Sequence, residues 1–135
     1  MESLKYCFSD DFHIIGDFDI NTRLAAKWKV TCVQAAVAFW RMHGKNLSIF
    51  HREKEIHELK TWFKQMKNNQ LISSQTNFNK VLLSAYFLET MQSIMKNGFV
   101  KSFLMVAKYP FCFDKIKLIL ALLLPKFLLR KIKNY

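Results

Sequence analysis

Only three glycines and two prolines interrupt this chain of 135 residues, and this scarcity limits the folds that it can adopt. Loop-rich and all-β domains use Gly and Pro at their many turns. Hydrophobic residues make up 51% of the chain, which is too many for a disordered protein. We therefore expect a mainly helical domain with a short β pair and a core of moderate size.

Helices are predicted where apolar residues recur at a spacing of three or four. The first covers about 17–28, and its expected buried stripe comprises Ile20, Leu24 and Trp28. A longer helix covers about 49–68, with Ser48 as its cap. Its expected apolar stripe comprises Phe50, Ile56, Leu59, Trp62, Phe63 and Met66.

The C-terminal half is predicted to be helical throughout, after a polar linker "NNQLISSQ". One helix covers about 77–97 and is followed by Gly98 as its C′ residue. The next covers about 99–108 and stops before Pro110. The last begins near Asp114, breaks at Pro125 and resumes to Lys133.

Two short strands are predicted between the first two helices, over 30–34 and 37–42. β-Branched and aromatic residues alternate with smaller ones there. Cys32 lies in the first strand and is interpreted as a core residue. The three cysteines are far apart, so neither a disulfide framework nor a zinc site is indicated, and a reducing cytosol is the expected compartment.

Positive charge accumulates toward the C-terminus, although the whole chain has a net charge of +11. Residues 1–48 hold six basic and five acidic residues, a net of +1. Residues 49–97 hold seven and four, a net of +3, and residues 98–135 hold eight and one, a net of +7. We treat these ranges as three parts of the chain: an N-terminal part, a helical extension and a basic amphipathic part.

The basic part combines its charge with the most apolar run of the chain, Leu118–Leu124. Seven residues cannot span a bilayer, which needs about 20. Apolar side chains mixed with basic ones are typical of a helix that lies in the membrane interface, where each basic residue contributes about 1 kcal/mol. The alternatives are an ordinary amphipathic helix and, least supported, nucleic-acid binding. The basic residues expected at an anionic membrane are Lys115, Lys117, Lys126, Arg130, Lys131 and Lys133.

Two acids, Asp17 and Asp19, follow Gly16 at the start of the first predicted helix. Acids in a first helical turn stabilise the helix by about 0.3–1 kcal/mol, which is the commonest explanation for such a pair. A D-x-D metal site is the second explanation, although side chains two apart on a helix point in different directions. A catalytic base with a supporting neighbour is the third.

The span "IIGDFDINTRLAAKWKVTCVQAAVAFWRMHGKNLS", residues 14–48, resembles the C-terminal part of the catalytic domain of bacterial family 2 glycosyltransferases. The resemblance rests on three features in order: Gly16-Asp17-Phe18-Asp19, then Arg23-Leu24, then the turn "WRMHGKNLS". It implies an inverting enzyme with a GT-A α/β fold, of which this chain would carry the C-terminal half followed by amphipathic helices. Gly16 departs from the pattern, because many members have Glu there.

The resemblance implies a role for each matching residue. Asp17 would be the catalytic base that deprotonates an acceptor hydroxyl, with Asp19 and Arg23 in support. Arg23 lies four residues after Asp19 and could pair with it. His43 would lie near the nucleotide diphosphate and its metal, and Arg41 could bind phosphate. A backbone-bonding turn histidine and a solvated arginine are the alternatives for these two.

The resemblance also implies what this chain lacks. The nucleotide-binding half of such an enzyme, with its own D-x-D and a Mg²⁺ or Mn²⁺ ion, has no counterpart in the sequence. We therefore expect a fragment that is inactive and needs no cofactor when alone. It would be either the product of a truncated or split reading frame or one part of a two-chain enzyme, whose partner would be a separate N-terminal half chain. In the intact enzyme the donor would be a nucleotide-sugar and the acceptor a glycan or lipid-linked molecule of polysaccharide synthesis. The basic, Leu-rich tail is similar to tails in bacterial members and predicts a peripheral location at the cytoplasmic face of the membrane.

Overall fold

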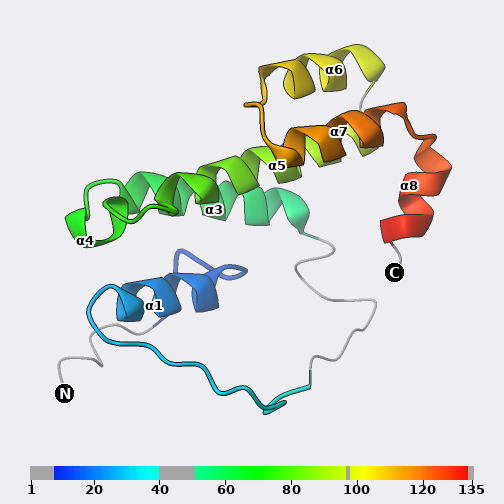
Figure 1. The fold of residues 1–135 in the computed structure, drawn as a ribbon. Coiled ribbons are helices and arrows are strands. Elements are labelled where there is room, and N and C mark those ends of the chain that lie inside the picture. Colours follow the sequence, from blue (N-terminus) through cyan, green and yellow to red (C-terminus); the bar gives the residue numbers. More distant parts are fainter. Residues whose placement is uncertain (1–7, 40–50, 97, 134–135) are drawn as a thin grey trace. The chain divides into compact units, whose positions relative to one another are not determined.

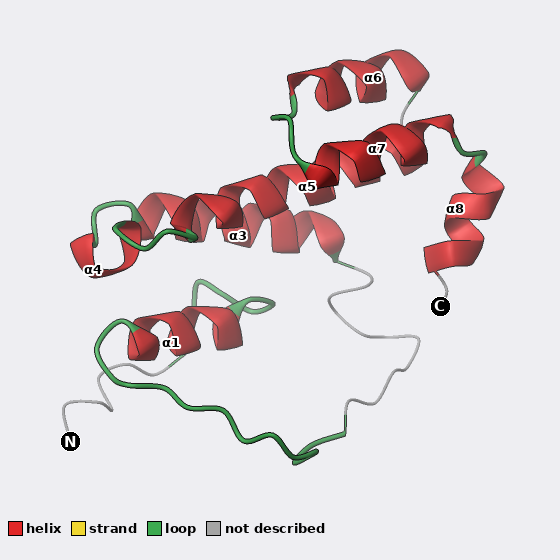
Figure 2. Cartoon of the chain, in the orientation of Figure 1, coloured by secondary structure: helices red, strands yellow, loops and turns green. Residues whose placement is uncertain are grey.

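A computed structural model describes residues 8–39, 51–96 and 98–133, the last four of these by their backbone alone. Its helices are α1 (Gly16–Ala25), α3 (Arg52–Met66), α4 (Gln70–Ser73), α5 (Phe78–Lys96), α6 (Phe99–Lys108), α7 (Phe113–Leu123) and α8 (Lys126–Lys133) (Figure 1). No strand occurs in these ranges (Figure 2). The mainly helical prediction is confirmed.

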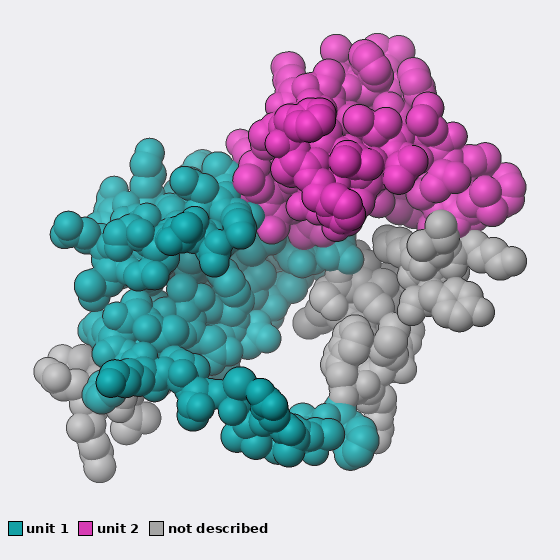
Figure 3. All heavy atoms as spheres, in the orientation of Figure 1, with its two compact units in different colours: residues 1–82 teal, residues 83–135 magenta. Residues whose placement is uncertain are grey.

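The chain divides into two compact units, residues 1–82 (unit 1) and residues 83–135 (unit 2) (Figure 3). The boundary lies inside α5, between Leu82 and Leu83. The composition of the sequence had indicated boundaries near residues 48 and 97 instead. One helix, α5, supplies side chains to both cores. The amino-acid composition therefore does not change at the boundary between the two units.

Unit 1 is built around Trp62 of α3, which is almost completely buried. The edge of the Phe18 ring meets Trp62 with 4.9 Å between the ring centroids. Phe63 and Phe78 stack with their centroids 4.5 Å apart. These contacts join α1, α3 and the start of α5, and aromatic pairs at such distances stabilise beyond their buried area by about 0.5–1.5 kcal/mol. The buried core residues are Phe12, Ile15, Trp62, Ile72 and Phe78.

Unit 2 is a helical hairpin of α6 and α7 on the second part of α5, with Leu129 of α8 added to the core. The Tyr109 hydroxyl, in the turn between α6 and α7, donates to the Leu83 carbonyl at 3.1 Å. The Lys115 amine donates to the carbonyls of Ala107 at 3.1 Å and Tyr109 at 2.7 Å. Lys115 thus caps the end of α6 from α7. The buried core residues are Ile94, Val106, Tyr109, Leu118, Ala121 and Leu129.

The predicted strand pair is absent from the part of the chain that the structure describes. Residues 29–39 are extended and exposed, and they form no strand with another described segment. Phe39 has 98% of its surface exposed, and Cys32 is exposed rather than in the core. A strand needs a partner strand to satisfy its backbone, so β-prone residues alone do not form one. Residues 40–42 of the second predicted strand lie outside the described residues.

The predicted buried stripe of the first helix is found only in part, since Ile20 and Leu24 are half-buried. α1 ends at Ala25, and Trp28 beyond it is exposed. Its buried positions are Gly16 and Asp19, because the Asp19 carboxylate turns inward to a polar partner. A hydrophobic pattern cannot identify a face that is buried through a charged residue.

Most helix limits in the C-terminal half match the prediction, including 99–108 and the break at Pro125. Gly98 differs: its φ is −68° and it is the N-cap residue of α6, not a left-handed residue after α5. The polar linker contains the short helix α4, in which the Asn69 side chain accepts from the Leu71 backbone N–H at 3.1 Å. α3 begins at Arg52 with His51 as its N-cap residue, and Ser48 lies outside the described residues.

Candidate functional site

Glu58 of α3 fixes the segment that leads into α1. Its carboxylate accepts three consecutive backbone N–H groups, from His13 at 3.1 Å, Ile14 at 2.8 Å and Ile15 at 3.1 Å. The side chain is 3% exposed, and the Lys54 amine lies 3.9 Å from its Oε1. Charge-assisted hydrogen bonds of this kind are about twice as strong as neutral ones. The entry into α1 is therefore held by a side chain more than 40 residues away.

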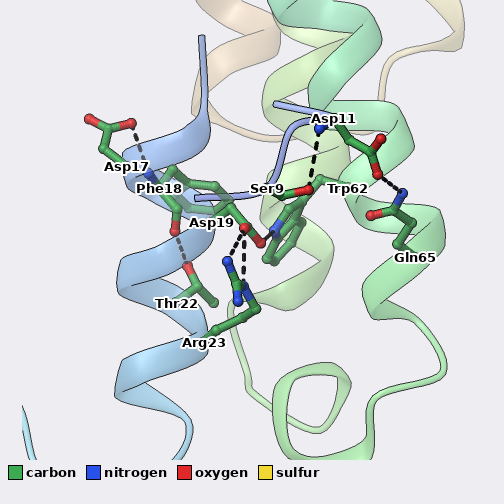
Figure 4. Close-up of polar contacts among 9 residues, drawn as sticks. All are labelled: Ser9, Asp11, Asp17, Phe18, Asp19, Thr22, Arg23, Trp62 and Gln65. Atoms are coloured by element: carbon green, nitrogen blue, oxygen red, sulfur yellow. Dashed lines mark hydrogen bonds and ion pairs between the residues drawn. The ribbon is translucent and has the colours of Figure 1, made fainter. Parts of the chain in front are cut away.

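Asp19 makes the second connection between α1 and α3. Its Oδ1 accepts from the Trp62 indole N–H at 3.0 Å, and its Oδ2 accepts from Arg23 at 3.0 Å and 2.7 Å (Figure 4). Asp19 is 1% exposed. A buried carboxylate must be paired and hydrogen-bonded, and here both oxygens are. Asp19 is thus a structural acid, with Arg23 as the i+4 partner that the spacing indicates.

Asp17 differs from Asp19 in its exposure and in its partners. It is exposed, and its Oδ1 accepts from the backbone N–H of Phe18 at 2.8 Å. Figure 4 shows its carboxylate directed away from Asp19, Arg23 and Trp62. The two acids therefore cannot hold one metal ion together, and the described residues contain no group of three His, Cys, Asp or Glu that could. Asp17 is left as an accessible carboxylate on the first turn of a rigidly held helix.

A hollow of about 290 Å³ lies on another face of α1, inside unit 1. Phe18, Thr22 and Ala26 line it from α1, and Trp62 lines it from α3. Asp17 is not among its lining residues. The remaining lining residues are Ala25, Ile72, Gln75, Asn77, Phe78 and Val81.

Gly16 opens α1 beneath an aromatic ring. A Cβ atom at this position would lie 3.3 Å from Cδ1 of Phe8. The position at which many glycosyltransferases of the resembling family carry an acid is thus partly covered by a phenyl group here. An accessory carboxylate would fit only if the Phe8 ring moved.

The other residues singled out from the sequence are distributed unevenly. Arg41 and His43 lie outside the described residues, so no structural statement applies to them. Lys115 is held by two carbonyls, and Lys117 pairs with Asp114 at 2.9 Å and lies 4.9 Å from the centre of the Phe113 ring. Lys126 is exposed in α8, which also contains Arg130, Lys131 and Lys133, known by their backbone only.

Glu58 and Trp62 were not singled out from the sequence as parts of this site. Both lie on one face of α3, since they are four residues apart. When an acid lies on the same helix face as the largest apolar residue of that helix, its position indicates that the acid is buried.

Comparison with known protein families, with curated proteins and with solved structures finds no match to this chain. In the described ranges, every helix is too short or too polar to cross a membrane.

Proposed function

We propose that this chain is the acceptor-side, C-terminal portion of an inverting family 2 glycosyltransferase, with Asp17 as its catalytic base. The observation that supports this best is the contrast between the two acids. Both oxygens of Asp19 are hydrogen-bonded within the protein, whereas Asp17 is exposed on the same helical turn. Glu58 and Trp62 of α3 fix the position of that turn. A base must be held in place and yet remain accessible to its substrate.

The proposed reaction is a single displacement. The Asp17 carboxylate takes the proton of an acceptor hydroxyl, and the hydroxyl oxygen forms a bond to C1 of the donor sugar. The bond from C1 to the nucleoside diphosphate breaks, and the diphosphate leaves with the electron pair. Attack opposite the leaving group inverts C1.

The donor site would come from an α/β half that this sequence does not resemble. The extended segment 29–39 supports this part of the proposal. Val30, Val33 and Val37 are all exposed there, although such residues are usually buried in sheets. Partner strands from a nucleotide-binding half would cover them and restore the expected β pair. The natural partner is therefore a separate half chain or a sheet supplied in the same enzyme.

A Mg²⁺ or Mn²⁺ ion would offset the charge of the departing diphosphate in the intact enzyme. The described residues do not fit such an ion, because Asp17 and Asp19 diverge and no other group of ligands is present among them. Its ligands would come from the donor half and from His43, with Arg41 toward phosphate.

The test is nucleoside diphosphate release by the chain purified with its native partners. We expect Asp17→Asn to lower turnover at least about a hundredfold, because general base catalysis contributes 10²–10⁴-fold. Asp10→Asn is the matched control, since Asp10 is an exposed acid outside α1. Equal turnover of Asp17→Asn and the unchanged protein would exclude Asp17 as the base.

Calorimetric titration of the chain alone tests the missing half. We expect no heat of binding with UDP or UDP-sugars in the presence of Mn²⁺. Tight, metal-dependent binding would mean that the chain builds a donor site itself and is not a portion of a larger site.

A second candidate function is binding to an anionic membrane surface through the basic part, residues 98–135, which would place the protein at the cytoplasmic face. The observation in its favour is that unit 2 combines nine basic and two acidic residues with many exposed apolar side chains. Flotation with vesicles of phosphatidylcholine, with and without phosphatidylserine, tests it. Binding only in the presence of phosphatidylserine is expected, and no flotation with either vesicle would exclude it.

A further inference from the structure

The outer faces of α6 and α7 are apolar, although both helices already contribute to the core of unit 2. On α6, Ser102 and Val106 are buried, while Phe99 and Phe103 stack on the exposed side with 6.2 Å between their ring centroids. Exposed apolar side chains that gather on the side of a helix opposite its buried residues mark an interaction surface. The exposed apolar residues of α6 are Phe99, Val100, Phe103 and Leu104.

α7 repeats this arrangement. Leu118 and Ala121 face the core, and a second apolar face points to solvent. Phe111 lies in the turn between the two helices and is 89% exposed. We call the exposed apolar residues of α6, this turn and α7 the hairpin face; the two helices are labelled in Figure 1. Beyond those of α6, it comprises Phe111, Phe113, Ile116, Ile119, Leu120 and Leu123.

We propose that the hairpin face is a membrane-insertion surface, which enters the headgroup and upper acyl region of an anionic lipid leaflet with Phe111 at its tip. This inference rests on the second candidate function and specifies its contact residues. It assigns insertion to α6, the turn and the exposed side of α7, not to the lysines chosen from the sequence. Lys115 could contact a lipid headgroup only by losing its hydrogen bonds to the carbonyls of Ala107 and Tyr109. Lys117 is already paired with Asp114.

Charge identifies the partner as a lipid surface of opposite sign. Unit 2 has a net charge of +7, with nine basic against two acidic residues. A second copy of the unit would bring the same charge and be repelled. Lys101 and Lys108 border the apolar side of α6, are exposed, and have no charge partner among the described residues. Basic residues beside apolar ones match an anionic leaflet, whose headgroups are negative and whose interior is apolar.

The experiment uses the full chain and vesicles of phosphatidylcholine with 30% phosphatidylserine, a composition of about the charge density of a cytoplasmic leaflet. We expect Phe103→Ser and Phe111→Ser each to lower the partition coefficient about tenfold, because each removes one inserted aromatic ring. Phe8→Ser is the matched control: Phe8 is exposed on unit 1 and should leave partitioning unchanged. Lys108→Gln should lower binding about fivefold, and Lys117→Gln less than twofold.

The outcomes separate the two proposals. No partitioning of the unchanged chain overturns both the membrane function and the hairpin face. Partitioning that is equal in the unchanged chain, Phe103→Ser and Phe111→Ser keeps the membrane function and overturns the hairpin face. A dimer in solution that Phe111→Ser dissociates also overturns it, in favour of a second copy. Circular dichroism melts of each variant confirm folding, which exposed positions should preserve.

Discussion

The two units of this chain differ in the kind of polar group that their cores contain. Unit 1 buries two carboxylates, Asp19 and Glu58, and satisfies each with several hydrogen bonds. Unit 2 buries no carboxylate among its described residues: its core is mostly apolar, and its buried polar groups are neutral, such as the Tyr109 phenol and the hydrogen-bonded hydroxyls of Ser93 and Ser102. Buried charges fix one arrangement because every alternative leaves a charge unpaired, whereas apolar contacts tolerate adjustment. A unit held in one arrangement suits a site whose side chains must keep fixed positions. An exposed apolar surface suits a partner that can adapt its own shape, such as a lipid layer.

The largest effect is expected where the fixed arrangement of unit 1 is broken. Asp19→Asn should lower the free energy of unfolding by about 3 kcal/mol, because it removes the buried negative charge that pairs with Arg23. Urea unfolding followed by tryptophan fluorescence measures this loss. Asp11→Asn, at an exposed position, should change it by less than about 0.5 kcal/mol. Similar midpoints for both variants would show that unit 1 does not depend on the buried pair.

A smaller effect is expected at the other carboxylate. Glu58→Gln should cost about 2 kcal/mol, since an amide has one acceptor oxygen and cannot receive all three N–H groups. Amide hydrogen exchange should accelerate at His13, Ile14 and Ile15, which a general loss of packing would not single out. Glu55→Gln is the control, because Glu55 makes a partly exposed ion pair with Arg52 within α3 and receives none of these three N–H groups. Unchanged exchange at these three amides would refute the assignment of Glu58 as an anchor.

The smallest effect concerns the single phenol in the core of unit 2. Burial raises the pKa of Tyr109 above its ordinary value, with Cys112 and Asp114 adding to the shift. The neutral phenol is thus favoured in the folded state. Its contribution to stability is complete below about pH 10 and is lost as the pH rises through the raised pKa.

Tyr109→Phe removes this contribution together with the hydrogen bond to Leu83. Stability at neutral pH should fall by about 1 kcal/mol. Thermal melts between pH 8 and 11 should show a smaller alkaline loss in the variant than in the unchanged chain. Parallel pH profiles would mean that Tyr109 is as exposed to titration when folded as when unfolded.

The sequence predicted unit 2 better than unit 1, and the reason is the range of the interactions. Pro110, Pro125 and local apolar spacing determine where α6, α7 and α8 begin and end, and these are short-range features. The buried face of α1 depends on Trp62, which lies 43 residues from Asp19. No local pattern contains that information.

The candidate site was predictable in part. The Asp17-Asp19-Arg23 spacing indicated that the two acids point in different directions and that Asp19 and Arg23 can pair. It did not reveal that Asp19 is buried or that Glu58 holds the preceding loop. The prediction of a strand pair was wrong for a different reason. Residues 30–39 do have β propensity, but a strand forms only when its backbone pairs with a second strand. No other described segment pairs with these residues.

The extended segment after α1 affects how long this protein should persist in a cell. Residues 30–40 contain no charge, proline or glycine and are rich in valine, alanine and aromatic residues. Residues 30–39 of this run are exposed and pair with no other described segment, and runs of this composition promote β-aggregation. We therefore expect a chain in which this run stays uncovered to be short-lived in a cell.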